Sequence, residues 1–261
     1  MRQIVLSAAL AAVCLPIWAA DTKDNIDPQT IIKKFAAKEA EFRDARNNYT
    51  YRQSVKLEEL DASGNPTGGK WEIVEDIIFT PEGRRMEKVI YAPVQNLRQI
   101  IITPSDEADL RNIQPFVLTS ADINDYNIEY IGREKLDEIG TYAFSVKPKK
   151  LAPGKRYFEG QIWVDDRDLQ IVKTYGKGVG VKKGDEQFPK FETYREQIDG
   201  KYWFPTYTHA EDTLHFKNGP VRIRETVKYQ DYKRYEGKST IKYGDVVDEK
   251  DKPATPPPTK K

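Results

Sequence analysis

The stretch "RYFEGQIWVDDRDLQIVKTYGKG", residues 156–178, contains two runs of alternating apolar and polar residues separated by a group of acids. Alternation with a period of two is typical of β-strands, so these runs predict a hairpin. Asp165, Asp166 and Asp168 stand at its turn, where aspartate is favoured because its side chain can accept hydrogen bonds from nearby backbone amides. A metal site is the alternative, but the acids lack the spacing, the glycine and the distal glutamate of an EF-hand loop. We therefore interpret them as turn residues.

Similar alternating runs occur on both sides of this hairpin, and together they predict about ten strands. Asp199-Gly200 predicts a two-residue turn between two of them. Residues 176–190 contain "GKGVG", but they lack the full phosphate-loop motif and predict a mobile, lysine-rich loop. Residues 95–104 fit a strand or a helix equally well. The other runs lie at 49–60, 70–79, 84–93, 126–132, 141–148, 191–198, 201–211 and 221–235.

Two segments have helical patterns. Asp27 is suited to cap a helix that begins at Pro28. Apolar residues then recur every three or four positions until about Asn47, which predicts an amphipathic helix. Thr103-Pro104 opens a shorter, acidic helical stretch. The sequence therefore predicts a mainly β, α+β fold with one curved antiparallel sheet. The N-terminal helix and the short helical insert would cover its concave face.

The ends of the chain differ from its middle. Residues 1–20 have a basic start, a short apolar run and small residues at the end, which predicts a cleavable secretory signal peptide rather than a spanning helix. Lipidation of Cys14 is the alternative, but Val13 fits that signal poorly. Residues 21–243 would form one domain. Residues 244–261, rich in proline and lysine, predict a disordered tail.

Composition argues against several classes of function. Cleavage would remove Cys14, the one cysteine, and with it disulfides and thiolate chemistry. Without Arg2, the 42 basic residues fall to 41, equal to the 41 acidic residues. The mature chain would then have no net positive charge to attract the phosphates of a nucleic acid. His209 and His215 would lie about 20 Å apart on one strand, too far to share a metal. We therefore predict no catalytic residue, no metal and no cofactor.

Apolar residues predicted to face inward suggest a cavity instead. A curved sheet that is covered by only one or two helices can leave space for an apolar ligand, although an ordinary packed core is the alternative. The predicted cavity-lining residues are Phe35, Ile78, Leu110, Phe116, Phe144, Val146, Phe158, Ile162, Val164, Ile171 and Phe204.

Four motifs carry a family resemblance. They are "QPFVLT" (114–119), "YNIEYIGREKLDEIGTYAFSVKPKK" (126–150), "YFEGQIWVDDRDLQIVKTYG" (157–176) and "DGKYWFPTY" (199–207). In this order they resemble the outer-membrane lipoprotein-sorting proteins of the lipoprotein carrier (LolA-like) superfamily, over roughly residues 28–235. The resemblance implies a half-open antiparallel barrel with a cavity for acyl chains, and no catalytic residue.

Two functions follow as hypotheses. The first is a periplasmic, non-enzymatic carrier or sensor that binds a lipid or the acyl chains of a lipoprotein. The second is a cell-envelope interaction module with a filled core and a protein partner. A hydrolase would need a buried histidine or paired carboxylates in a cleft, and the sequence offers no such cluster.

Overall fold

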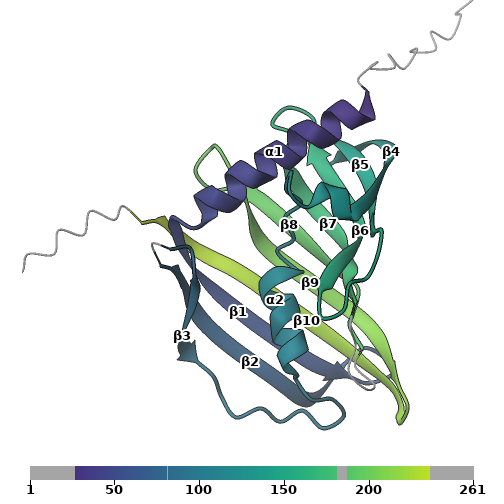
Figure 1. The fold of residues 1–261 in the computed structure, drawn as a ribbon. Helices are drawn as coiled ribbons and strands as arrows, with labels where there is room; N and C mark the ends of the chain where they lie inside the picture. The colour runs from purple at the N-terminus through teal and green to yellow at the C-terminus, as the bar shows by residue number, and fades with distance from the viewer. Residues whose placement is uncertain (1–26, 81, 181–186, 236–261) are drawn as a thin grey trace, which may run out of the picture.

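The computed structural model describes residues 27–80, 82–180 and 187–235. In these ranges ten antiparallel strands form one sheet, in the order β3-β2-β1-β10-β9-β8-β7-β6-β5-β4 (Figure 1). The strands are β1 (Tyr49–Leu60), β2 (Pro66–Phe79), β3 (Arg85–Tyr91), β4 (Tyr126–Leu136), β5 (Ile139–Pro148), β6 (Arg156–Asp165), β7 (Ile171–Gly180), β8 (Phe191–Gln197), β9 (Trp203–Phe216) and β10 (Gly219–Arg234). The helices are α1 (Pro28–Arg46), α2 (Pro104–Asn112) and the short 3-10 helix η1 (Ile123–Asp125).

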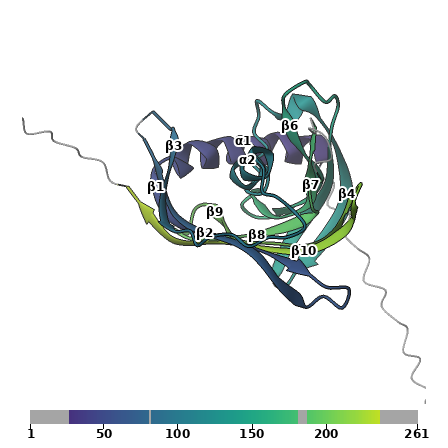
Figure 2. The same cartoon turned by 90° about the horizontal axis from the view of Figure 1, so that it is seen from below.

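The sheet is curved and open, which confirms the predicted fold class. In the described part of the chain, β3 and β4 each pair with a single neighbour and form the two edges. Figure 2 shows the sheet bending around α1 and α2, which lie on its concave side. The predicted signal peptide and the predicted tail at 244–261 lie outside the described residues. None of the helices in the described ranges is long and apolar enough to cross a bilayer.

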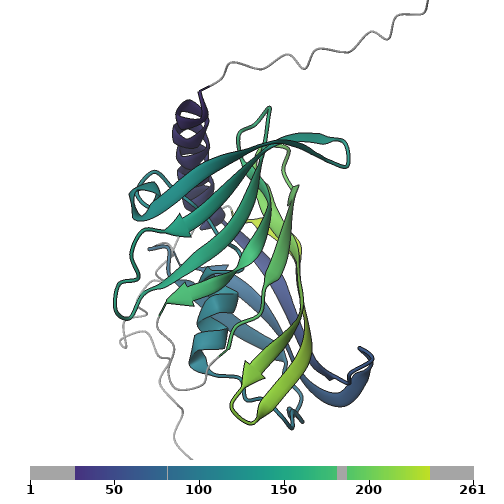
Figure 3. The same cartoon turned by 90° about the vertical axis from the view of Figure 1, so that its right-hand side faces the viewer.

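The strand order explains why residues 92–125 lie on the concave face. β3 ends at one edge of the sheet, and the next strand in sequence, β4, forms the opposite edge. The chain between them must therefore cross a face of the sheet. It crosses on the concave side and contributes α2 on the way, as the side view in Figure 3 shows.

Helix α1 is held by its apolar stripe and by one buried charge. The side chain of Asp27 accepts hydrogen bonds from the backbone amides of Gln29 and Thr30, which confirms the predicted cap. The stripe contains Ile31, Ile32, Phe35, Ala36 and Phe42, and Glu39 shares it. An acid in an apolar stripe needs a partner, because an uncompensated buried charge is strongly unfavourable.

Arg195 on β8 is that partner. Its Nη1 atom lies 3.0 Å and 3.1 Å from the two carboxylate oxygens of Glu39, and both side chains are almost completely buried. The same carboxylate accepts a hydrogen bond from the backbone amide of Ile171 at 3.1 Å. Arg195 also donates to the carbonyl oxygen of Phe116 and lies over the ring of Phe42. The pair therefore joins α1, β7, β8 and the segment after α2.

Two sequence predictions need adjustment, and one is confirmed. The segment 176–180 continues β7 as far as Gly180, so the first part of the predicted loop is strand, while residues 181–186 lie outside the described residues. Residues 95–102 form neither helix nor strand. The acids at 165–168 form the predicted turn, in which the side chain of Asp165 accepts hydrogen bonds from the amides of Arg167 and Asp168.

We expect the substitution Glu39→Ala to lower the free energy of unfolding by about 3–5 kcal/mol, because it leaves the Arg195 guanidinium buried without a carboxylate. Urea unfolding followed by circular dichroism measures this loss. The matched control is Glu41→Ala on the same helix, where an exposed pair with Lys38 is lost and the change should stay below about 1 kcal/mol. Equal, small losses in both variants would contradict an anchoring role for Glu39.

Candidate functional site

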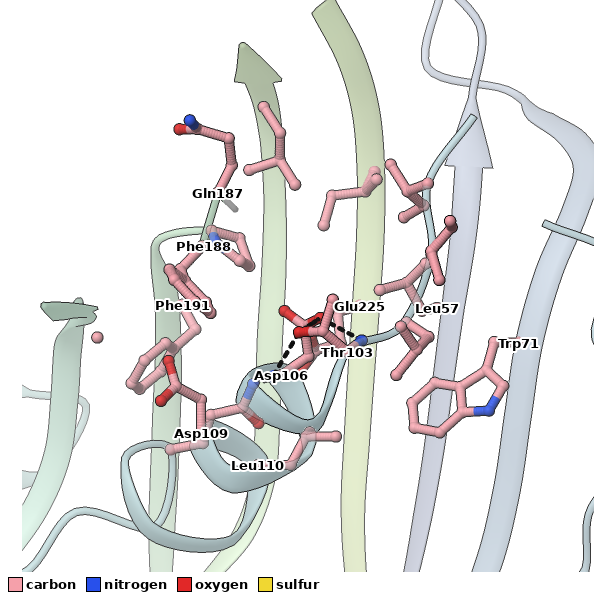
Figure 4. Close-up of a pocket in the computed structure, with 18 of the residues that line it drawn as sticks. Leu57, Trp71, Thr103, Asp106, Asp109, Leu110, Gln187, Phe188, Phe191 and Glu225 are labelled. Carbon is pink, nitrogen blue, oxygen red and sulfur yellow. Dashed lines mark hydrogen bonds between the residues drawn. The ribbon is translucent and has the colours of Figure 1, made fainter. Parts of the chain in front are cut away.

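An apolar hollow lies between α2, the segment before α2 and the concave face of the sheet (Figure 4). We call it the slot. It encloses about 800 Å³ of empty space, part of which is open to solvent, but the centre of a water-sized molecule fits into only about 90 Å³ of it. The slot is therefore narrow. Its apolar lining residues are Leu57, Trp71, Ile100, Ile101, Ile102, Leu110, Phe188, Pro189, Phe191, Leu214, Phe216 and Ile223.

Residues 92–102, which we call the strap, form one wall of the slot. A buried carboxylate fastens it to the sheet, because Oε1 of Glu59 on β1 accepts hydrogen bonds from the backbone amides of Arg98, Gln99 and Ile100 at 2.9, 2.7 and 3.2 Å. The other oxygen, Oε2, is buried with no hydrogen-bond partner among the described residues. A Cβ atom at Gly69 would lie 2.2 Å from this oxygen, so the glycine leaves room for the carboxylate.

Helix α2 forms the second wall and is capped at its start. Thr103 and Asp106 form a capping box in which each side chain accepts a hydrogen bond from the backbone amide of the other residue. Near the other end, Asp109 pairs with Arg156 on β6, whose Nε atom lies 3.0 Å from Oδ1. The guanidinium of Arg156 also lies 3.8 Å from the ring centre of Phe188. These contacts fix α2 and Phe188 at the slot.

One carboxyl group lies in the slot without a cationic partner among the described residues. Glu225 on β10 accepts a hydrogen bond from the side-chain amide of Gln114, and both residues are buried. Burial, together with the nearby charges of Asp106 and Asp109, raises the pKa of Glu225 to about 7, although the Gln114 bond acts in the opposite direction. The Glu225 carboxyl therefore changes from neutral to charged near neutral pH.

The predicted cavity residues mostly lie elsewhere. Leu110 alone among them lines the slot. Ile78 lies on the outer face of β2, because its neighbour Ile77 takes the buried inward position. Phe204 packs in a separate cluster with Phe42 and Tyr49. The others form one buried core beneath α1, which contains Phe35, Phe116, Phe144, Val146, Phe158, Ile162, Val164 and Ile171.

The two histidines and the acidic turn contribute nothing to the slot. His209 and His215 occupy alternate positions of β9, on the face opposite to the inward Ala210 and Leu214. Within the described ranges, no group of three or more histidine, cysteine, aspartate or glutamate residues is placed to hold a metal ion.

Sequence reasoning missed Glu225, Glu59 and Arg195, although each carries a signal. Glu225 stands at an inward position of β10 beside the apolar Val221, Ile223 and Val227. Glu59 shares the buried phase of β1 with Leu57, and Arg195 shares that of β8 with Phe191. A charged residue at an inward strand position is rarely buried unless it has a hydrogen-bond or ion-pair partner. The three isoleucines at 100–102, directly before the cap of α2, were a signal for the strap.

No protein-family model and no curated protein sequence matches the chain. It is similar to a solved DUF1329 family protein from Desulfovibrio piger, with 13% identity over 81% of this chain and 94% of that chain and a TM-score of 0.39. A LolA superfamily protein from Nitrosomonas europaea has 15% identity over 81% and 95% of the two chains, with a TM-score of 0.33.

A putative outer membrane lipoprotein-sorting protein domain from Vibrio parahaemolyticus has 15% identity over 79% of this chain and 94% of that chain, with a TM-score of 0.35. The last two structures bear the names that the sequence motifs resemble. At these identities and TM-scores, no ligand or partner follows from the similarity. The evidence on function is therefore the geometry and lining of the slot.

We expect Glu59→Ala to release the strap. The three backbone amides would lose hydrogen bonds to a charged acceptor, which contribute about 1.5–3 kcal/mol, so amide exchange at residues 98–100 should accelerate by roughly 10- to 100-fold. Hydrogen exchange read by mass spectrometry or NMR measures this. Glu58→Ala, one residue away on the opposite face of β1, is the control and should leave those amides unchanged. Unchanged exchange in Glu59→Ala would argue against the clamp.

Glu225 should make stability depend on pH. Its carboxyl has an ordinary pKa of 4.5 and a folded-state pKa of about 7. Below pH 4.5 Glu225 is protonated in both the folded and the unfolded protein, and the stability that its neutral form contributes is fully present. As pH rises from 4.5 through about 7, the unfolded state ionises first, so stability should fall by up to about 3 kcal/mol relative to Glu225→Gln. Urea unfolding of both proteins between pH 4 and pH 8 checks this, and parallel profiles would contradict it.

Proposed function

We propose that this protein is a non-enzymatic carrier or sensor of the bacterial periplasm, and that it binds the hydrocarbon chain of a lipid or lipidated ligand in the slot. The single observation that supports this is the lining: the strap, α2 and the sheet direct isoleucine, leucine and aromatic side chains at one narrow space that reaches solvent (Figure 4). Such apolar pockets with a few polar groups are typical ligand sites.

The physical driving force is the removal of apolar surface from water. Burial contributes about 25 cal/mol per Å² of apolar area, and the cost of ordering the ligand and the walls reduces the net gain. The strap lowers that cost, since Glu59 holds its backbone in place before a ligand arrives. Ile101 is 80% exposed, so contact with a hydrocarbon chain would remove an apolar side chain from water.

The slot, rather than the space beneath α1, is the proposed binding region. The core beneath α1 is filled by its own side chains, since Phe35, Phe144 and Phe158 are each 0% exposed. A ligand there would have to displace a packed aromatic cluster. The slot needs no such displacement, because α2, which is held to β6 through Asp109 and Arg156, leaves a space between itself and the sheet.

A second candidate function is an envelope protein-interaction module. One observation favours it: Met86, Val89, Ile90 and Tyr91 on the edge strand β3 are 51%, 53%, 45% and 54% exposed. An edge strand with exposed apolar side chains can pair with an extended segment of a partner. In that case the slot would have no ligand, and substitution of slot residues would leave the interaction intact.

A slot-blocking substitution tests the carrier proposal. Ile102→Trp on the strap should fill the slot and weaken binding of the neutral fluorescent probe N-phenyl-1-naphthylamine by about tenfold or more, a loss of at least about 1.4 kcal/mol. The matched control is Val94→Trp on the same strap, where the side chain is 97% exposed and lies outside the slot. It should bind as the unaltered protein does. Absence of probe binding, or equal binding by both variants, would refute the proposal.

A further inference from the structure

A second space continues from the slot along the concave side of the sheet. An intermediate space next to the slot shares Trp71 and Leu110 with it, and it shares Arg85 and Arg111 with a third space near the C-terminal end of α1. Asp106 lines the slot and Asn112 lines the third space. These residues lie about 9 Å apart along α2, at the usual helical rise. One extended molecule could therefore reach from the slot to the third space.

The third space, which we call the arginine pocket, encloses about 720 Å³, part of which is open to solvent. Four guanidinium groups line it, those of Arg43, Arg46, Arg85 and Arg111, and Asp44 is the acid among its lining residues. They come from the end of α1, the start of β3 and the end of α2, so the fold brings together arginines that are far apart in sequence.

Two of these arginines have carboxylate partners outside the pocket. Arg85 pairs with Glu87 at 2.9 Å and donates to Tyr51 and Gln53. Arg111 reaches the other oxygen of Glu87 at 3.4 Å and Glu107 at 3.7 Å. The two carboxylates, Glu87 and Glu107, balance the charges of these two guanidinium groups, so the uncompensated positive charge at the pocket comes from the arginines of α1.

The other two arginines are less well compensated. Arg43 lies 3.7 Å from Asp44, and its Nη1 atom donates to Thr119 at 3.4 Å. Nε of Arg46 is buried and has no hydrogen-bond partner among the described residues, and no described carboxylate forms an ion pair with this side chain. Burial and the charges of Arg195 and Arg85 lower the pKa of Arg46, while Tyr51 acts in the opposite direction. A crowded cation with a free donor is a site where an anion would be strongly favoured.

We propose that the arginine pocket binds the anionic headgroup, a phosphate or a carboxylate, of the ligand whose hydrocarbon chain lies in the slot. This inference rests on the proposed function and narrows the ligand to an anionic amphiphile. The chain would lie among Ile102, Leu110 and Ile223, and the headgroup oxygens would accept hydrogen bonds from Arg46 and Arg43. The intermediate space joins the two ends, because it shares Trp71 and Leu110 with the slot and Arg85 and Arg111 with the arginine pocket. Its lining also contains Glu75, Glu87 and Glu107, so the anionic headgroup is placed beyond them, in the arginine pocket.

Competition against N-phenyl-1-naphthylamine tests the inference with two ligands of equal chain length, dodecyl phosphate and dodecanol. Dodecyl phosphate should displace the probe about tenfold more tightly than dodecanol from the unaltered protein, as expected for one or two charge-assisted hydrogen bonds. Arg46→Gln and Arg43→Gln should each reduce that preference, and Arg46→Gln should bring it to within about twofold. The affinity for dodecanol should not change in either variant.

Arg167→Gln is the matched control, since this exposed arginine lies on the β6–β7 turn outside the slot and the arginine pocket. Circular dichroism establishes that each variant is folded, and Arg43→Gln, at an exposed position, serves if Arg46→Gln does not fold. Probe binding with equal displacement by both ligands would overturn the headgroup site and leave the carrier proposal intact. Failure of the probe to bind would overturn both proposals.

Inorganic phosphate distinguishes a headgroup from a free anion. If phosphate alone raises the melting temperature of the unaltered protein but not of Arg46→Gln, and dodecyl phosphate shows no preference over dodecanol, the pocket binds a free oxyanion and the headgroup assignment is wrong. A preference for dodecyl phosphate that depends on Arg46 supports the assignment, whether or not phosphate alone binds.

Discussion

The buried ion pair between Glu39 and Arg195 holds α1 to the sheet, and the arrangement of the concave face follows from it. It places two charges inside a protein core, an arrangement that is tolerated because each charge has further partners: the amide of Ile171 for the acid and the carbonyl of Phe116 for the base. These bonds fix the position and rotation of α1 on the sheet. With α1 fixed, its phenylalanines fill one half of the concave face, and the other half is left to the segment that crosses it.

That crossing segment follows from topology. Because β3 and β4 are the two edges of the open sheet, residues 92–125 must traverse the concave face. An extended backbone inside a hollow exposes amides that need acceptors, and Glu59 provides one carboxylate oxygen for three of them. α2 satisfies its own backbone and is attached through Asp109 and Arg156. The slot is the space that remains between these attached elements.

The alternation of apolar and polar residues along the strands predicted much of the fold. Individual residues show which features it predicted correctly and which it did not. The helix from Pro28, the strand from Tyr49, the turn at Asp165 and the cap at Thr103 all follow from local preferences, and the structure has them. Ile78 was predicted to face inward, but it faces outward. Which of two adjacent strand residues faces inward depends on the pairing with the neighbouring strand, and here Ile77 pairs with the buried Tyr51. The predicted cavity residues are inward-facing, apart from Ile78, but inward-facing residues can either fill a core or line a space.

Most of the strands, the starts of α1 and α2 and the apolar character of the strands' inner faces were predictable from the residues alone, because these features depend on neighbours within a few residues. Which part of the sheet's concave side is filled and which part is open could be seen only in the folded chain. That outcome depends on contacts such as Glu39 with Arg195, Glu59 with the strap and Arg46 beside Arg85, which join residues distant in sequence. Side-chain volume and charge at such long range leave no periodic pattern in the sequence, so the slot and the arginine pocket emerge only once the chain is folded.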